Sequence, residues 1–377
     1  MSKKAIAAAV LALAAAFAPA PEARAANAEA NAILRLLNSR AAGDPKSYAA
    51  AAAIVAEDAK AGKPLQQFVL AVVSRERNAP PAARLDAATR RKYFDNSRER
   101  IRALAESHSN ALAWYLLALE NNDMRMLKRA AEGENVQALN AWGTMTLMQV
   151  LQSPGVDTND METVLYQSYS AFRKAADKKD ANGLYNVGMC LMRGYGCKID
   201  PPRAFENFRA AAEMGHAEAI NNIGGFFRDG IVVERDPVKA ARWFAKSADR
   251  GNAYGLLNYA LALQRGDGVA QDVERAVKML KASAEQGNEE AMNAYAMCLY
   301  NGDGVAQNRQ LAVRWYRASA AHGFAPAMEN LAACCDAGTG GMKKSPGEAL
   351  VWRMRARAAR GDRNAAAWLV QSGHGMK

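Results

Sequence analysis

Residues 211–230 read AAEMGHAEAINNIGGFFRDG, and residues 283–308 read SAEQGNEEAMNAYAMCLYNGDGVAQN. Each stretch places one glycine between two helix-forming segments, at Gly215 and at Gly287. Together with Gly251 and Gly323, these glycines form a series with a constant spacing of 36 residues. A constant spacing of this length is typical of a chain built from repeated structural units. We therefore expect this repeat to decide the fold.

Two further series keep the same interval. Glycine recurs at the other end of each unit and alanine recurs inside it: Gly194, Gly230, Gly266, Gly302 and Gly338, and Ala204, Ala240, Ala276 and Ala312. Apolar residues between these positions lie three and four apart, as in Ala240–Ala248, which indicates amphipathic helices. A single helical hairpin cannot bury its own apolar stripe, so the hairpins must stack on one another. The sequence therefore predicts an all-α solenoid of helical hairpins.

These motifs resemble the Sel-one-like repeat, a tetratricopeptide-related α/α repeat family. The resemblance rests on the two stretches quoted above and on AVRWYRASAAHG at residues 312–323. It implies a right-handed α/α superhelix whose curved surface serves as an adaptor for other proteins. It implies no particular reaction, since the motifs specify a fold rather than a chemistry.

The repeat divides the chain into five predicted parts. They are a signal peptide at 1–25, an irregular helical capping region at 26–108, degenerate repeats at 109–178, regular repeats at 179–361, and a C-terminal capping helix and tail at 362–377. Within these parts we expect a long basic helix over Ala82–Ser107 and an insertion loop from Ser153 to Asp160. The terminal parts should cover the open ends of the stack, because solenoid ends need a polar outer face.

The N-terminus has the features of a secretory signal peptide. Lys3 and Lys4 precede an apolar run from Ala5 to Phe17, and Ala23-Arg24-Ala25 follows as a cleavage site. The apolar run is too short for an ordinary membrane span, and no later segment of the sequence is long and apolar enough to be one. We expect export to a periplasm or beyond after cleavage near Ala25, with an uncleaved anchor as the alternative.

The formal net charge of +11 favours acidic surfaces as partners. Arginine and lysine are concentrated in Arg75–Arg102 and Lys343–Lys377, whereas the central repeats mix both signs. No nucleic acid is expected, because basic residues are not interleaved with stacking aromatics on one face. An envelope polyanion bound by the basic ends, or a simply solvated surface, are the alternatives to an acidic protein partner.

Five cysteines in an oxidising compartment invite pairing and leave one over. Cys190, Cys298 and Cys334 share one repeat position, where we expect small buried core residues. Cys190 and Cys197 flank the turn that starts at Gly194, so a local disulfide between them is possible.

The sequence contains no recognisable catalytic, metal or cofactor motif. Gly266-Asp267-Gly268 and its counterpart at Gly302 lack the carboxylate spacing of a calcium loop and the lysine of a phosphate loop, so we interpret them as turns. The four histidines have no zinc-enzyme spacing, and no serine lies in a nucleophile elbow. We therefore predict no enzyme and no cofactor, and we expect His216 and His322 either to cap helix ends or to be simply exposed.

An asparagine series marks the predicted binding surface. In solenoids of the family that this chain resembles, the first helices line the concave groove, and asparagine amides there can bind an extended peptide. On that basis we predict these ligand-facing residues: Tyr185, Asn186, Asn221, Asn222, Asn258, Asn293 and Asn330, with Arg193, Arg228 and Arg265 at the groove rim. The alternative is that the amides form helix-to-helix hydrogen bonds, since a buried amide must be satisfied either way.

The sequence thus predicts an exported, non-enzymatic scaffold that binds another protein or peptide along its concave face. The alternative is a cell-wall-directed protein that binds or hydrolyses β-lactams or peptidoglycan, because cysteine-rich relatives of this repeat are associated with those ligands. Such relatives carry paired cysteines in nearly every unit, whereas the units from Gly215 to Gly287 contain none.

Overall fold

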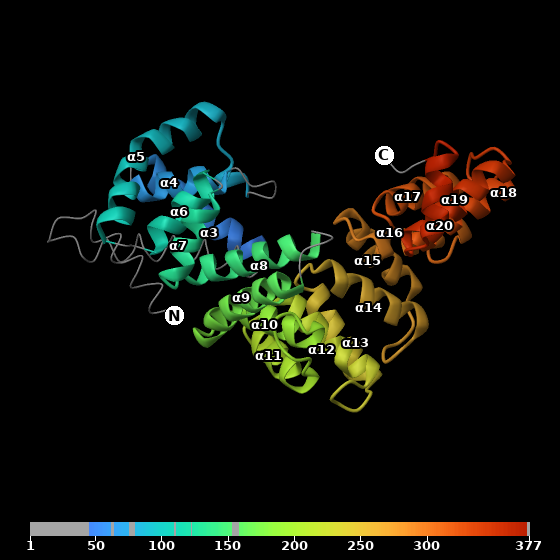
Figure 1. The fold of residues 1–377 in the computed structure, drawn as a ribbon. Helices are drawn as coiled ribbons and strands as arrows, with labels where there is room; N and C mark the ends of the chain where they lie inside the picture. The colour runs from blue at the N-terminus through green and yellow to red at the C-terminus, as the bar shows by residue number, and fades with distance from the viewer. Residues whose placement is uncertain are drawn as a thin grey trace. The chain divides into compact units, whose positions relative to one another are not determined.

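The computed structural model describes residues 45–61, 64–74, 80–108, 111–121, 123–152 and 158–374, and every regular element within them is helical (Figure 1). The predicted all-α fold is confirmed. Among the described helices, none is both long and apolar enough to cross a bilayer. The predicted signal peptide at 1–25 lies outside the described residues, so it stays a prediction, as do the predicted domain boundaries.

The described chain forms two compact units that divide between Ala219 and Ile220. The first unit contains α3 (Pro45–Lys60), α4 (Pro64–Val73), the 3₁₀ helix η2 (Pro81–Ala83), α5 (Ala87–His108), α6 (Ala111–Asn121), α7 (Met124–Glu132), α8 (Val136–Gln152), α9 (Thr158–Asp177), α10 (Ala181–Arg193) and α11 (Pro201–Glu213). Helix α12 (Ala217–Asp229) begins in the first unit and continues into the second. The second unit adds α13 (Pro237–Ala248), α14 (Ala253–Arg265), α15 (Val273–Glu285), α16 (Glu289–Asn301), α17 (Arg309–Ala321), α18 (Ala325–Ala337), α19 (Pro346–Ala359) and α20 (Arg363–Gln371).

The second helix of each regular hairpin starts at a polar cap. The cap side chain accepts the backbone N–H of the residue three positions later, and this holds at Asp200, Asp236, Asp272, Asn308 and Ser345. Such caps satisfy backbone donors that the first helical turn leaves unpaired. Proline follows directly at Pro201, Pro237 and Pro346, where a missing N–H costs nothing.

A small residue at one repeat position lets the two helices of a hairpin approach closely. At Gly224 an added Cβ would lie 2.6 Å from the ring of Phe244. The equivalent residues in the following hairpins are Ala260, Ala296 and Ala332, all fully buried. Close helix approach buries the apolar stripes that a single hairpin leaves exposed.

The Gly-Asp-Gly motif makes a tight turn against the preceding hairpin. Gly266 ends α14 with φ +70°, and Gly268 has φ +73°. A Cβ at Gly268 would lie 2.0 Å from the carbonyl oxygen of Pro237, at the start of α13. The motif therefore forms a turn, in agreement with its interpretation from the sequence.

The prediction of a helix over Ala82–Ser107 was wrong about where the helix begins. Pro81–Ala83 form a short 3₁₀ helix, and α5 begins only at Ala87. Asp86 starts the helix, because its Oδ1 accepts the backbone N–H of Thr89 at 2.9 Å.

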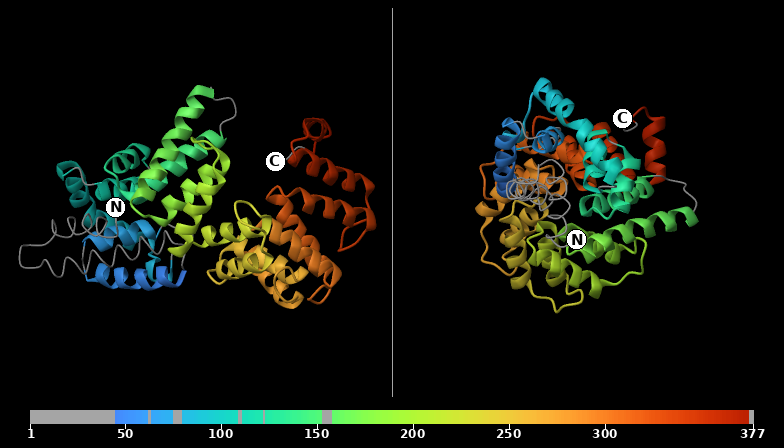
Figure 2. Two further views of the ribbon diagram at one scale, coloured as in Figure 1. Left: turned by 90° about the horizontal axis from the view of Figure 1, so that it is seen from below. Right: turned by 90° about the vertical axis from the view of Figure 1, so that its left-hand side faces the viewer.

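The expected insertion loop from Ser153 to Asp160 was also wrong in part, because residues 158–160 belong to α9. The additional residues lengthen both helices of the hairpin: α8 has 17 residues and α9 has 20, against 13 in α10. Figure 2 shows these two long green helices running antiparallel. Helical residues pair their own backbone groups, so a longer hairpin absorbs an insertion without unpaired polar groups.

Candidate functional site

The predicted ligand residues fall on first helices, as expected, but in both units. Tyr185, Asn186 and Arg193 lie on α10 in the first unit. The other predicted residues lie on α12, α14, α16 and α18 in the second unit, and we call them the first-helix face of that unit: Asn221, Asn222, Arg228, Asn258, Arg265, Asn293 and Asn330.

Two pairs of asparagines on the first-helix face are hydrogen-bonded to each other. Asn258 Nδ2 donates to Asn221 Oδ1 at 2.9 Å, which joins α14 to α12. Asn330 Nδ2 donates to Asn293 Oδ1 at 2.9 Å, which joins α18 to α16. Each pair spans 37 residues, so it links one hairpin to the next. These are helix-to-helix hydrogen bonds of the kind that the alternative interpretation required.

The pairing does not use up the amides. A carboxamide has two N–H donors and a carbonyl oxygen with two lone pairs, so one bond between two amides leaves most of this capacity. Asn221, Asn258 and Asn330 are also only partly buried. The same side chains can therefore join neighbouring hairpins and contact a peptide.

An equivalent amide in the first unit was missed. Asn186 Nδ2 donates to Asn140 Oδ1 at 3.4 Å, and Asn140 Nδ2 donates to Asp180 Oδ1 at 2.7 Å. The insertion after α8 displaces Asn140 from the 36-residue register, which hid it. The resemblance of residues 135–143 to the start of a repeat was the available signal.

The structure brings Arg228, Asn258 and Arg265 together around one hollow of about 60 Å³ between α12, α13 and α14. Arg235 also lines this hollow, and Asp267 is the one carboxylate among the lining side chains. A hollow of this size has room for a small polar group such as a carboxylate, but not for a whole small-molecule ligand. We call it the arginine hollow.

Each arginine of the hollow is held differently. Arg228 binds Asp229 through Nε at 2.7 Å and Nη2 at 2.9 Å, and its Nη1 donates to Asn258 Oδ1 at 3.3 Å. The bond to Asp229 raises the pKa of Arg228 above its ordinary value and lowers the pKa of Asp229. Arg265 forms no ion pair with any residue that the structure describes. Its guanidinium group is therefore not held in an ion pair within the described structure, although Asp267 lines the same hollow.

Sequence reasoning missed Arg235, although a periodic signal existed. Arg235 Nε donates to the carbonyl oxygen of Arg228 at 3.1 Å. Gln271 and Gln307 follow at 36-residue steps and donate to carbonyls at the equivalent helix ends, at 2.7 and 3.0 Å. Arg235 thus makes the same side-chain to carbonyl hydrogen bond as Gln271 and Gln307, and it also carries a positive charge.

The repeats of this chain match the model of a known sequence family. The Sel1 repeat model matches residues 105–123, 181–216, 217–252, 253–288, 289–324 and 325–352, which together make up half of the chain. The chain belongs to the Sel1 repeat family. The resemblance to the Sel-one-like repeat is thereby confirmed. Proteins of this family are generally protein-interaction scaffolds.

Solved structures of other Sel1 repeat proteins are similar. A Sel1 repeat protein from Oxalobacter formigenes is 25% identical with a TM-score of 0.51, and the alignment covers 68% of this chain and 95% of that one. The c5321 protective antigen of uropathogenic Escherichia coli, which has an SLR fold, is 27% identical with a TM-score of 0.51, over 85% of this chain and 67% of that one. No curated protein matches this Sel1 repeat chain by sequence.

The cysteines of this Sel1 repeat protein are thiols in the structure. Cys190, Cys298 and Cys334 are buried, as predicted from their shared position. Burial raises the pKa of Cys190 to about 12, and Cys197 is partly exposed. The disulfide between Cys190 and Cys197 stays a prediction.

Two other predicted site residues lie in the first unit, Tyr185 and Arg193. Tyr185 stacks on the ring of His216 with the centroids 4.5 Å apart, which orients its ring toward the neighbouring helix. Arg193 is exposed at the end of α10. Within the described residues, no group of three histidine, cysteine or acidic side chains is arranged to hold a metal ion.

Proposed function

We propose that this Sel1 repeat protein is an exported, non-enzymatic scaffold that binds an extended, acidic segment of another protein on the first-helix face of its second unit. The arginine hollow is the observation that carries the proposal. It gathers the guanidinium groups of Arg228, Arg235 and Arg265 beside the Asn258 amide. Arginine is well suited to bind carboxylates, because its planar donors match the two oxygens.

The amides extend this surface beyond the hollow. The hydrogen-bonding capacity left on the Asn221–Asn258 and Asn293–Asn330 pairs suits the N–H and C=O groups of a peptide backbone. Backbone contacts hold a segment without selecting its sequence. The hollow would then add selectivity for a glutamate or aspartate side chain.

The hollow carries more positive than negative charge even after its internal pairing. Asp229 neutralises Arg228, and Asp267 can neutralise only one of the two remaining guanidinium groups. The net charge of the chain has the same sign, at +11. An acidic partner would therefore be attracted over a distance and then held by the hollow.

Export of the protein is part of this proposal. It is supported by Lys3, Lys4 and the apolar run that leads to Ala23-Arg24-Ala25. The partner would then be a periplasmic or secreted protein.

A binding measurement with a defined acidic peptide tests the proposal. The probe is a fluorescein-labelled peptide of alternating glutamate and alanine, titrated with the full chain and followed by fluorescence anisotropy. Arg265→Ala should weaken binding about ten-fold, which corresponds to about 1.4 kcal/mol. Binding should also weaken with added salt, because the contact is between charges at a surface.

Arg242→Ala is the matched control. Arg242 is an exposed arginine on α13, a second helix, and it does not line the hollow. The proposal expects no change in its affinity. Equal losses in Arg265→Ala and Arg242→Ala would reduce the binding to general charge attraction and overturn the assignment of the hollow.

A further inference from the structure

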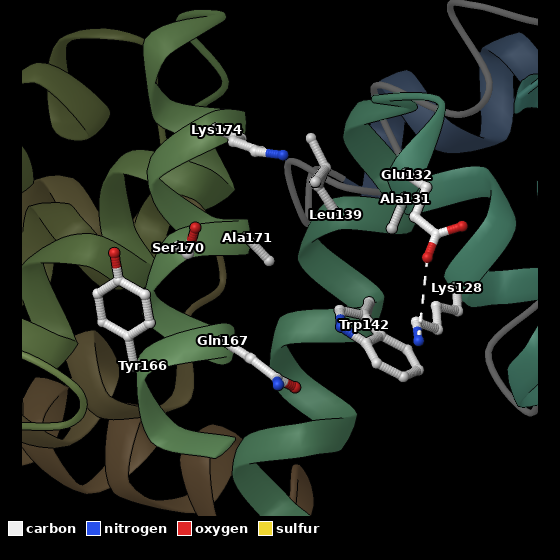
Figure 3. Close-up of a pocket in the computed structure, with 10 residues that line it drawn as sticks. All are labelled: Lys128, Ala131, Glu132, Leu139, Trp142, Tyr166, Gln167, Ser170, Ala171 and Lys174. Atoms are coloured by element: carbon white, nitrogen blue, oxygen red, sulfur yellow. Dashed lines mark ion pairs between the residues drawn. The ribbon is translucent and has the colours of Figure 1, made fainter. Parts of the chain in front are cut away.

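The first unit contains a larger hollow, lined by α7, α8 and α9, that is separate from the first-helix face of the second unit (Figure 3). Its volume is about 250 Å³. Whole small-molecule sites commonly occupy about 300–1,000 Å³, so this hollow suits one large side chain rather than an entire ligand. We call it the Trp142 hollow.

The hollow lies between α7 and α9, which both pack on α8 and differ in length. Helix α7 has nine residues, whereas α9 has 20. An ion pair between Glu134 and Lys178 holds the turns that follow these two helices together. With those ends aligned, α9 continues past the start of α7, so α7 does not flank that part of α9. Tyr166 lies in this part of α9 and is 63% exposed.

The floor of the hollow is apolar. Ala131, Leu139 and Ala171 are buried at its base. Trp142 packs with part of its surface against the core of the first unit and lines the hollow with the rest. Tyr166 and Gln167 also line the hollow from α9, and Figure 3 shows Gln167 extending toward Trp142. An aromatic ring placed on this floor would be removed from water and would contact the Trp142 ring.

The rim of the hollow is positively charged. Lys128 is 3.9 Å from Glu132 on the same helix, so these two charges largely balance. Lys174 forms no ion pair within 4 Å with any residue that the structure describes. Figure 3 shows its ammonium group extending from α9 across the opening toward Leu139. One positive charge therefore remains beside the apolar floor.

Helix α8 carries exposed apolar residues away from the hollow. Met145 and Met148 follow Trp142 at three-residue steps and are 42% and 47% exposed. Residues three apart are neighbours on a helix surface. Large exposed apolar side chains that continue from a hollow are typical of a protein-binding surface rather than of a buried small-molecule site.

We propose that the Trp142 hollow is a second binding site, which takes an aromatic side chain of a partner segment that also carries a carboxylate. The ring packs beside Trp142 on the apolar floor, and the carboxylate binds the ammonium group of Lys174. The site belongs to the first unit, so it does not depend on the arginine hollow.

The probe for this proposal is 1-anilinonaphthalene-8-sulfonate, an aromatic anion whose fluorescence rises in apolar sites. The full chain should bind it saturably. Lys174→Ala should weaken its binding at least five-fold, since a charge-assisted contact is lost. Ser170→Phe should abolish binding, because the new ring occupies the hollow that Ser170 lines. Far-UV circular dichroism verifies that both variants fold.

Two matched controls distinguish binding in this hollow from general charge attraction and from binding in the arginine hollow. Lys278→Ala removes an exposed lysine from α15 of the second unit, and Arg265→Ala removes the free guanidinium of the arginine hollow. Neither should change the affinity for the probe. Unchanged binding by Lys174→Ala would overturn the proposal even if Ser170→Phe failed to fold, because Lys174 is exposed and outside the core.

The need for a carboxylate is tested by displacement. The peptide acetyl-Glu-Trp-Glu-amide should displace the probe, and acetyl-Gln-Trp-Gln-amide should do so at least five-fold less well. Equal displacement would contradict the role of Lys174. Failure of both peptides to displace the probe would contradict the aromatic site itself.

Discussion

Asn258 on α14 donates its carboxamide N–H to Oδ1 of Asn221 on α12, at a distance of 2.9 Å. The same relationship recurs between Asn330 and Asn293, one pair of hairpins further on. Leu257 and Ala294 occupy the corresponding positions between these pairs, so the intervening hairpins lack the bond. Asparagine side chains therefore join the first helices in two separate pairs, α12 with α14 and α16 with α18.

We predict that this link contributes measurably to stability. In a double-mutant cycle of Asn221→Ala and Asn258→Ala, the coupling energy should be about 0.5–1.5 kcal/mol, the usual net contribution of an internal hydrogen bond. Urea denaturation of the wild type, the two single variants and the double variant measures it. Additive single effects would show that the amides do not stabilise each other.

The second glycine of the Gly-Asp-Gly turn should be the less replaceable of two glycines with similar backbone angles. Gly268 and Gly251 have φ of +73° and +75°. A Cβ at Gly251 meets nothing within 4 Å, whereas at Gly268 it would lie 2.0 Å from Pro237 O. Gly251→Ala should cost about 1–2 kcal/mol for the left-handed backbone alone.

Gly268→Ala should cost at least twice as much as Gly251→Ala, because the turn must also move away from α13. Thermal and urea denaturation of the two variants provide the comparison. Equal losses would mean that the close approach to Pro237 does not contribute to packing.

The glycine series of the sequence marks helix ends of the regular repeats. Gly266 and Gly302, for example, directly follow the last residues of α14 and α16. The start of α5 was missed because Asp86, which caps it, belongs to no periodic series. Local signals therefore placed most helices, and failed where the cap was unique.

The sites depended on information that spacing does not contain. Arg228, Arg235 and Arg265 are brought together only by the packing of α12, α13 and α14. The Trp142 hollow is likewise lined by residues of α7, α8 and α9 that come together only when these helices pack. In each hydrogen bond between two asparagine side chains, the sequence also does not show which residue donates and which accepts.

His216 caps α12 as a neutral imidazole. Its Nδ1 accepts the backbone N–H of Ala219 at 3.3 Å, and its Nε2 lies 3.1 Å from Asn182 Oδ1. Asp180, Asn252 and Asn288 occupy the equivalent position in other hairpins. This confirms that His216 caps a helix end, as predicted.

Burial lowers the pKa of His216 below its ordinary value of 6.5, although the nearby carboxylates of Glu218 and Asp180 oppose the shift. The unfolded chain therefore takes up this proton at a higher pH than the folded chain. The contribution of neutral His216 to the unfolding free energy is complete above pH 6.5. It is lost as the pH falls through the lowered pKa of His216 in the folded state.

Replacing the histidine by the asparagine of neighbouring caps should remove this pH dependence. The difference in unfolding free energy between the wild type and His216→Asn, measured by urea denaturation over a pH series, should change in favour of His216→Asn as the pH falls below 6.5. A difference that stays constant with pH would contradict a neutral, buried cap.

Binding of an acidic segment should protect the first-helix face of the second unit from solvent exchange. Hydrogen–deuterium exchange of the full chain, with and without the glutamate-alanine peptide, tests it most directly. If the segment binds there, exchange should slow in residues 220–229 and in α14, around the arginine hollow. Slowed exchange confined to α5 or to residues 343–377, where basic residues are concentrated, would contradict it.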